Sequence, residues 1–133
     1  MLVEDNPDEE SLTQRGLRRA GRAEKIAIAR NGAEAIALLV KMVPLPCLVL
    51  LDLKLPKING TEVLRQIRSD ERTRHLCVVI FTSSNEPGDI ARCYSLGCNS
   101  YVIKPVTYED YINSVEQIAD YWLDVNAPPT LSG

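Results

Sequence analysis

The residue of this chain that most clearly suggests chemistry is Asp52, which ends an unbroken apolar run from Leu48 to Leu51. Pro46 and Pro56 bound this stretch, and a short apolar run bounded in this way is typical of a fully buried strand. A carboxylate at the end of such a strand is poorly solvated, so its charge is costly unless another group compensates it. A group that compensates the charge of Asp52 is therefore expected near it.

Other polar side chains follow the ends of the remaining predicted strands, and they are Glu4, Asp5, Thr82, Ser83 and Lys104. Carboxylates that converge on one rim disfavour each other's ionised form unless a counter-charge is present. A divalent cation such as Mg²⁺, which binds carboxylates, water and phosphate oxygens, supplies that charge. Lys104 adds a point charge suited to a phosphate oxygen or to Asp52. The set favours phosphoryl transfer, with Asp52 as the nucleophile.

Each of these residues also has an ordinary structural explanation. A lone Asp after an apolar run often caps a loop, and Glu4 with Asp5 can complement the positive end of the following helix. Thr82 and Ser83 are common turn residues, and a single lysine means little. Their shared position at one edge of a predicted sheet favours the functional interpretation, because ligands of parallel sheets bind outside the carboxyl ends of the strands.

The elements that position these residues alternate between strand and helix. Strands are predicted at residues 1–4, 25–30, 47–52, 77–84 and 100–105, and helices at 7–21, 33–42, 61–70, 87–97 and 108–125. This alternation predicts a parallel sheet with helices on both faces. Asn6, Pro7 and Glu9 predict a helix start with a capping box, and Thr107 is the expected N-cap of the last helix.

Composition indicates one domain of 133 residues, with 45% hydrophobic and 25% charged residues. A net charge of −3 does not favour a nucleic-acid-binding surface. No apolar stretch has the length of a membrane span and no signal peptide precedes the fold, so a cytoplasmic protein is expected. The four cysteines are widely spaced, and reduced thiols are expected rather than a metal site or disulfides. Cys47 and Cys77 open apolar runs and are expected to be buried.

Four segments, "LVEDNPDE", "LLDLKLPKINGTEVLRQIR", "VVIFTSS" and "YVIKP", together resemble the receiver domain of bacterial two-component response regulators. The likeness spans residues 1–125, and residues 126–133 are expected to form a flexible tail. It implies a flavodoxin-like, doubly wound (βα)5 fold with a parallel sheet in the order 2-1-3-4-5. The loop "SDERTRHL" and the segment "DYWL" are most similar to small single-domain regulators paired with phytochrome-type histidine kinases.

The resemblance implies a role for individual residues. Asp52 matches the phosphoacceptor and Lys104 the lysine that accompanies it, with a cis bond to Pro105. Mg²⁺ would be bound by Asp52, by Asp5 directly, by Glu4 through water, and by the backbone carbonyl of Lys54. Thr82 matches the switch hydroxyl, Tyr101 the aromatic residue that moves inward with it, Ser83 a neighbour of the phosphate, and Gly60 the glycine after the acceptor loop.

The expected function is that of a stand-alone response regulator, phosphorylated on Asp52 by a sensor histidine kinase such as a bacteriophytochrome. It would catalyse only its own phosphotransfer and dephosphorylation, and it would signal through protein contacts of the fourth helix, last strand and last helix. DNA and membrane binding are not expected. A homodimer through that face is predicted, because the last helix has an apolar stripe wider than a core-facing helix needs, with Tyr111 and Trp122 at its margin.

Three other functions share part of this pattern. A haloacid-dehalogenase-type phosphatase also has a nucleophilic Asp after an apolar strand, but it needs a second Asp where this chain has Lys54. A flavodoxin-like cofactor binder needs a phosphate-binding loop after the first strand, and none follows. A receiver that serves only as a scaffold is disfavoured by the complete acidic set. Because the first strand normally begins earlier, residues before Met1 are expected in the natural product. Lys54 could also shield an acyl phosphate from water.

Overall fold

The sheet of this protein has five parallel strands. In the computed structural model, which describes residues 1–22 and 25–129, they follow the order β2-β1-β3-β4-β5. Their bounds are β1 (Leu2–Val3), β2 (Ile28–Ala29), β3 (Val49–Leu51), β4 (Val78–Thr82) and β5 (Ser100–Ile103). The predicted fold class and strand order are therefore confirmed.

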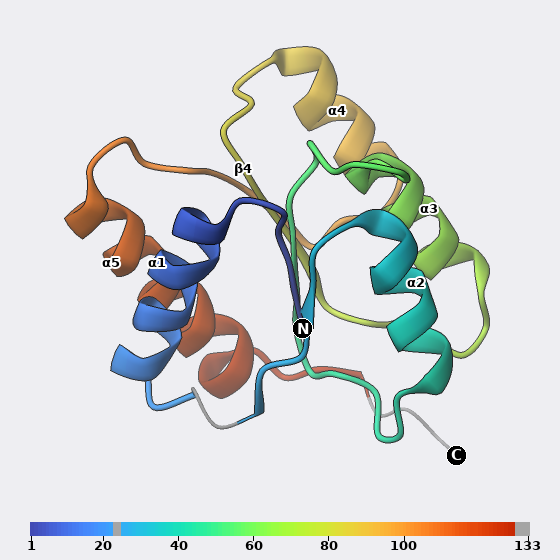
Figure 1. The fold of residues 1–133 in the computed structure, drawn as a ribbon. Coiled ribbons are helices and arrows are strands. Elements are labelled where there is room, and N and C mark those ends of the chain that lie inside the picture. The colour runs from blue at the N-terminus through green and yellow to red at the C-terminus, as the bar shows by residue number, and fades with distance from the viewer. Residues whose placement is uncertain (23–24, 130–133) are drawn as a thin grey trace.

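Five helices cover both faces of this sheet. They are α1 (Pro7–Arg19), α2 (Gly32–Lys41), α3 (Gly60–Ser69), α4 (Pro87–Ser95) and α5 (Tyr108–Ala119). Figure 1 shows α1 and α5 on one face, and α2, α3 and α4 on the other. The three central strands, β1, β3 and β4, are consequently buried on both sides, which explains why their residues are mostly apolar without alternation.

The register of the central strands fixes the positions of two acidic residues. Leu2 pairs with Ile28 on one side and with Leu50 on the other. Beyond the paired residues, the Glu4 amide donates to the Ala29 carbonyl at 3.0 Å, and the Asp52 amide donates to the Val3 carbonyl at 3.2 Å. Glu4 and Asp52 are thus held by the backbone at adjacent strand ends.

Two cores lie on opposite faces of the sheet. Under α2, α3 and α4, Val49 and Leu51 pack with Val63, Leu64 and Ile67. Under α1 and α5, the core comprises Leu2, Leu17, Leu48, Leu50, Cys77, Val79, Phe81, Tyr111, Val115, Ile118 and Ala119. Successive strand residues such as Leu50 and Leu51 enter different cores, as the alternation of side chains along a strand requires.

The first helix differs from its prediction at one point. Asn6 caps it as expected, because its side chain accepts the amides of Asp8 and Glu9. The predicted capping box is wrong, however, since the amide of Asn6 donates to Glu4 Oε1 at 3.1 Å and the carboxylate of Glu9 is bonded to Lys104. A long-range ion pair has replaced the local contact.

The last helix also departs from its prediction. Thr107 caps it as predicted, but regular α-helix ends at Ala119 and continues as a π-helical segment, η2 (Asp120–Val125). The wider π turn changes the direction of the later side chains, and Trp122 and Leu123 are half-buried against the core under α1 and α5. Tyr111, placed at the margin of that stripe, is only 4% exposed. Of the predicted tail, residues 130–133 lie outside the described residues.

Three surface features complete the fold. Cys77 is buried as predicted, but Cys47 is exposed because it precedes β3 in the connection from α2. Val40 is 69% exposed, since α2 packs through Ala35 and Leu39. Within the described ranges, no helix is long and apolar enough to cross a membrane.

Arg68, near the end of α3, ties together several segments of the fold. Its guanidinium donates to the carbonyls of Gly97 and Leu76, both at 2.8 Å, to that of Arg74 at 3.1 Å, and to Asn99 Oδ1 at 2.8 Å.

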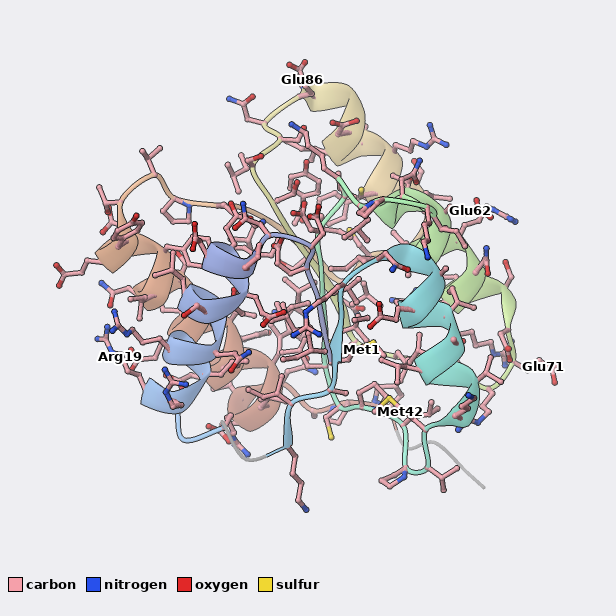
Figure 2. The ribbon with its side chains drawn as sticks, in the orientation of Figure 1. Met1, Arg19, Met42, Glu62, Glu71 and Glu86 are labelled. Atoms are coloured by element: carbon pink, nitrogen blue, oxygen red, sulfur yellow. The ribbon has the colours of Figure 1, made fainter. Side chains whose placement is uncertain are left out.

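Figure 2 places Glu86, just before α4, at the end of the molecule where the strands finish, and Met1 toward the opposite end of the sheet. The candidate site lies at the first of these ends.

Candidate functional site

Asp52 follows β3 directly and is 7% exposed. Its Oδ2 accepts a hydrogen bond from Lys104 Nζ at 2.8 Å, and its Oδ1 accepts one from the Lys54 amide at 3.3 Å. Both carboxylate oxygens therefore have a donor. The Lys104 ammonium is therefore the first group that compensates the charge of Asp52.

Lys104, which follows β5, is the centre of the site. Its backbone amide donates to the Thr82 carbonyl at 2.8 Å, so the end of β4 sets its position. Its ammonium contacts three carboxylates, Glu4 Oε2 at 2.7 Å, Glu9 Oε2 at 2.6 Å and Asp52 Oδ2 at 2.8 Å. Sequence reasoning had grouped Glu4, Asp52 and Lys104, and the structure brings these three together.

Glu9 is the residue that sequence reasoning assigned to the wrong partner. Its position three residues after Asn6 fits a capping box equally well, and nothing local to α1 distinguishes the two partners. The only available signal was geometric, because the first turn of α1 begins at the end of β1 beside Glu4. A carboxylate on that turn can reach the same edge of the sheet.

Burial changes the electrostatics of this cluster. Desolvation raises the pKa of Glu4 to about 7 and outweighs the opposing contact with Lys104. For Lys104, burial lowers the pKa, but attraction to Asp52 and the hydrogen bonds to the carboxylates together outweigh burial, so the pKa is raised. Lys104 consequently stays protonated and positively charged among the acidic side chains.

The carboxylates form a donor set that fits a hard divalent cation. One ligand oxygen from each of Glu4, Glu9 and Asp52 lies within 4.8 Å of the others. Oxygen donors of this kind are what Mg²⁺ and Mn²⁺ prefer. Asp5 was predicted as a direct ligand, but the structure leaves its side chain exposed and outside this group. The side chain of Lys54 is also exposed.

Thr82 ends β4 and is fully buried. Its Oγ1 is the one buried side-chain polar atom in the described part of the chain that has no hydrogen-bond partner. Such an orphaned buried hydroxyl is costly and requires an explanation. Ser83, predicted beside the phosphate, is exposed. The next residue, Ser84, is buried and donates from Oγ to Asp89 Oδ2 at 2.6 Å.

Tyr101 is linked to the same connection between β4 and α4. Its hydroxyl donates to the Ser84 carbonyl at 2.8 Å, and its ring packs against the core under α2, α3 and α4. Tyr101 and Thr82 are therefore joined through two residues of backbone. The peptide bond before Pro105, expected to be cis, is not cis. In the described ranges the cis peptide bond is Val43–Pro44.

Gly60 closes the loop after Asp52 at a point where no side chain fits. A Cβ atom there would lie 2.2 Å from the Asp52 carbonyl oxygen and 2.7 Å from Leu53 Cα. The Gly60 amide donates to the Leu53 carbonyl at 2.9 Å. The loop from Asp52 to α3 therefore returns onto its own start and holds the acidic residue in a fixed backbone frame.

Comparison with known proteins decides the family. The profile of the response regulator receiver domain matches residues 1–116. The chain belongs to the response regulator receiver family. The probable methanogenesis regulatory protein FilR2 of Methanothrix harundinacea (strain 6Ac) is 43% identical to this receiver domain, over 97% of the chain and 86% of FilR2.

Two phytochrome-related regulators share the whole fold. Response regulator Rcp1 of Synechocystis sp. (strain ATCC 27184 / PCC 6803 / Kazusa) is 33% identical, over 97% of this receiver domain and 91% of Rcp1. Its Mn²⁺-bound crystal structure superposes with a TM-score of 0.89, over 97% and 96% of the two chains. The phosphorylated cyanobacterial phytochrome response regulator RcpA is 34% identical and superposes with a TM-score of 0.91, over the same shares. The predicted likeness to phytochrome-associated regulators is confirmed.

Proposed function

We propose that this receiver domain is a stand-alone response regulator that takes a phosphoryl group from a sensor histidine kinase onto Asp52. The observation that carries the proposal is the contact of Asp52 with Lys104 at 2.8 Å, beside a fully buried Thr82 hydroxyl that has no partner in the described ranges. The comparison with Rcp1 and FilR2, of which this chain covers 91% and 86%, supports the proposal.

The proposed reaction is an in-line displacement at phosphorus. A carboxylate oxygen of Asp52 forms the new P–O bond, the P–N bond to the kinase histidine breaks, and its electron pair stays on the imidazole nitrogen. Lys104 neutralises charge that develops on the phosphoryl oxygens. Bound Mg²⁺, which Asp52 would hold directly and Glu4 through water, would further neutralise those oxygens. Asp5 and the backbone carbonyl of Lys54 are proposed to complete its ligands.

Labelling with a small phosphodonor tests this proposal. Acetyl phosphate with Mg²⁺ should add one phosphate that is stable in acid and labile in base, as detected by intact mass. Asp52→Asn should abolish labelling, whereas Asp110→Asn, which alters an exposed carboxylate in the first turn of α5, should leave it unchanged. Excess chelator should also stop it. Full labelling of the Asp52→Asn protein would remove the proposal.

The phosphoryl group is proposed to act through Thr82 and Tyr101. A phosphoryl oxygen offers the Thr82 hydroxyl its missing partner, and movement of Thr82 is passed to Ser84, whose carbonyl accepts the Tyr101 hydroxyl. This is a local charge event that biases a larger element. Thr82→Ala should still accept phosphate on Asp52 but lose the change in partner affinity. A normal affinity change in that variant would exclude the hydroxyl relay.

The surface that carries the signal is proposed to be the face formed by α4, β5 and α5. Four large apolar side chains are exposed there, Tyr94 (51%), Ile103 (44%), Val106 (99%) and Tyr108 (74%). Aromatic residues of this kind favour protein interfaces, and a two-fold contact between copies is the simplest use of them. Tyr111, which the prediction had placed in the interface, is buried against α1 and is replaced in this role by Tyr108.

Sedimentation at micromolar concentration, with and without beryllofluoride, tests the proposed homodimer. The double variant Val106→Ser and Tyr108→Ser should be monomeric where the wild type is dimeric. Val43→Ser removes an equally exposed apolar side chain from a different surface and serves as the control. A wild-type monomer under both conditions would exclude the dimer, as would a dimer that the double variant leaves intact.

The phosphodonor is proposed to be a phytochrome-type histidine kinase, supported by the likeness to RcpA and Rcp1. The net charge of −3 supports protein partners over DNA. A cytoplasmic location follows from this role and is supported by the free thiols of Cys77, Cys93 and Cys98. Transfer of radiolabelled phosphate from a purified kinase to Asp52 is the direct test of the donor.

A further inference from the structure

The contact between Glu9 and Lys104 is shorter than either of the other two that Lys104 makes, and it differs from them in its access to water. Glu9 Oε2 lies 2.6 Å from Lys104 Nζ, and 32% of the Glu9 side chain is exposed. By comparison, the side chains of Glu4, Lys104 and Asp52 are 2%, 4% and 9% exposed. Glu9 is therefore at the mouth of the site, and the other partners are inside it.

The ammonium of Lys104 has no free donor in this arrangement. A protonated lysine has three N–H groups, and the three carboxylates at 2.6, 2.7 and 2.8 Å take one each. A phosphoryl group on Asp52 brings new oxygens that need charge-assisted donors. For Lys104 to bind one of them, one of its present contacts has to be given up.

Exposure decides which contact is given up. Releasing Glu4 would leave an almost fully buried carboxylate without its partner, which is the most costly arrangement for a charged group. Releasing Glu9 costs much less, because water solvates its carboxylate at the mouth of the site. The contact with Asp52 lies at the reacting group itself and is carried over to the phosphorylated side chain.

We propose that Glu9 is a positioning residue that holds Lys104 in the unphosphorylated protein and is exchanged for a phosphoryl oxygen when Asp52 is phosphorylated. This inference rests on the proposed function of Asp52. Glu9 competes with the incoming phosphoryl group for the Lys104 ammonium, and it adds a negative charge where the anionic donor enters. Its presence therefore slows phosphorylation.

The backbone around Glu9 allows the exchange to occur by side-chain rotation alone. The Glu9 carbonyl accepts the hydroxyls of Thr13 at 2.8 Å and Tyr111 at 3.3 Å. Both are buried, and Tyr111 belongs to α5, so the first turn of α1 is fixed against α5. When the carboxylate leaves Lys104, α1 can keep its position while the side chain turns to solvent.

The test compares three variants at saturating Mg²⁺. Glu9→Gln weakens the contact and removes the charge, and Glu9→Asp keeps the charge but is one methylene too short to keep the contact. Glu10→Gln is the matched control, because Glu10 is the next carboxylate of α1 and pairs with Arg30 instead of Lys104. Losing an ion pair whose acidic partner is one-third exposed predicts initial labelling by acetyl phosphate about three- to tenfold faster in both Glu9 variants. Labelling of Glu10→Gln should stay within about twofold of wild type.

Two further readouts separate the inference from other roles. In metal-free protein labelled with ¹³C- and ¹⁵N-lysine, the Lys104 side-chain NMR signals should shift in both Glu9 variants and not in Glu10→Gln. Glu9 is one of the three carboxylates that could hold a cation, but in this proposal it acts on Lys104, so the Mg²⁺ dissociation constant, from calorimetry, should change less than about threefold. Supporting results are faster labelling of both variants together with the NMR shift.

Other results overturn the inference. Labelling of Glu9→Asp at the wild-type rate would mean that only charge matters, and unchanged labelling of Glu9→Gln would mean that Glu9 does not compete. A tenfold or larger loss of Mg²⁺ affinity in Glu9→Gln would make Glu9 a metal ligand. Each of these requires a wild type that is labelled. A wild type that takes no phosphate would overturn the proposed function, and the role of Glu9 with it.

Discussion

Thr82→Val should stabilise the unphosphorylated protein, although it removes a functional group. The side chain of Thr82 is fully buried, and within the described residues its Oγ1 has no hydrogen-bond partner. A buried unsatisfied hydroxyl costs about 1–3 kcal/mol, and valine has nearly the same shape and suits a β-strand. We therefore expect the free energy of unfolding to rise by about 1–2 kcal/mol, which is a few degrees in melting temperature.

The chain offers matched controls for this substitution. Thr13 is also fully buried, but its hydroxyl donates to the Glu9 carbonyl at 2.8 Å and lies 3.0 Å from the Tyr111 hydroxyl. Thr73 is 5% exposed, and its hydroxyl donates to the Ile67 carbonyl at 2.7 Å. The same change to valine at either position breaks satisfied bonds and should lower the free energy of unfolding by about 1–2 kcal/mol.

Urea unfolding in chelator, followed by circular dichroism, measures all three variants under one condition. The sign is the decisive quantity, because the chemical change is identical and only the hydrogen bonding differs. If Thr82→Val destabilised the protein as much as Thr13→Val does, the Thr82 hydroxyl would have a partner in the resting state. The argument that a phosphoryl oxygen supplies its missing partner would then be refuted.

Three further predictions concern the acceptor loop and the thiols. Gly60→Ala places a Cβ atom 2.2 Å from the Asp52 carbonyl oxygen, so it should lower the free energy of unfolding by more than about 2 kcal/mol, and urea unfolding that matches wild type would contradict this. At pH 8 a thiol reagent should modify exposed Cys47 quickly, and Cys77 and Cys93 only on unfolding, which peptide mapping would show. Burial raises the pKa of Cys77 and of Cys93 from 9.0 to about 11, so the folded protein holds these protons more firmly than the unfolded chain, and the free energy of unfolding should fall between pH 9 and 11.

The part of the site that could be predicted from sequence is the part set by strand ends. Asp52, Glu4 and Lys104 each follow a predicted strand, and parallel strands bring their carboxyl ends to one edge of the sheet. Periodicity was enough to locate those strands. The fold class, the strand order and the two-sided burial of the sheet follow from the same rule, once the resemblance to receiver domains supplies the order.

The parts that could not be predicted depend on side-chain direction and on distant partners. Glu4 and Asp5 were expected side by side as acidic ligands, but consecutive residues of an extended chain face opposite sides, so Glu4 is buried beside Lys104 and Asp5 is exposed. Glu9 contacts a lysine that is 95 positions away in the sequence, and no local pattern reports such a contact. The π-helical segment after Ala119 changed a spacing that the prediction held constant.

The three contacts of Lys104 have a consequence for how the protein is synthesised. They join residues separated by 100, 95 and 52 positions in the chain. A nascent chain that ends before Lys104 has already made Glu4, Glu9 and Asp52, but it lacks the cation that allows them to be buried together. Their mutual repulsion then opposes docking of the strand ends. The acceptor site therefore forms late in translation, and a ribosome-bound fragment without β5 should not be a substrate for a phosphodonor.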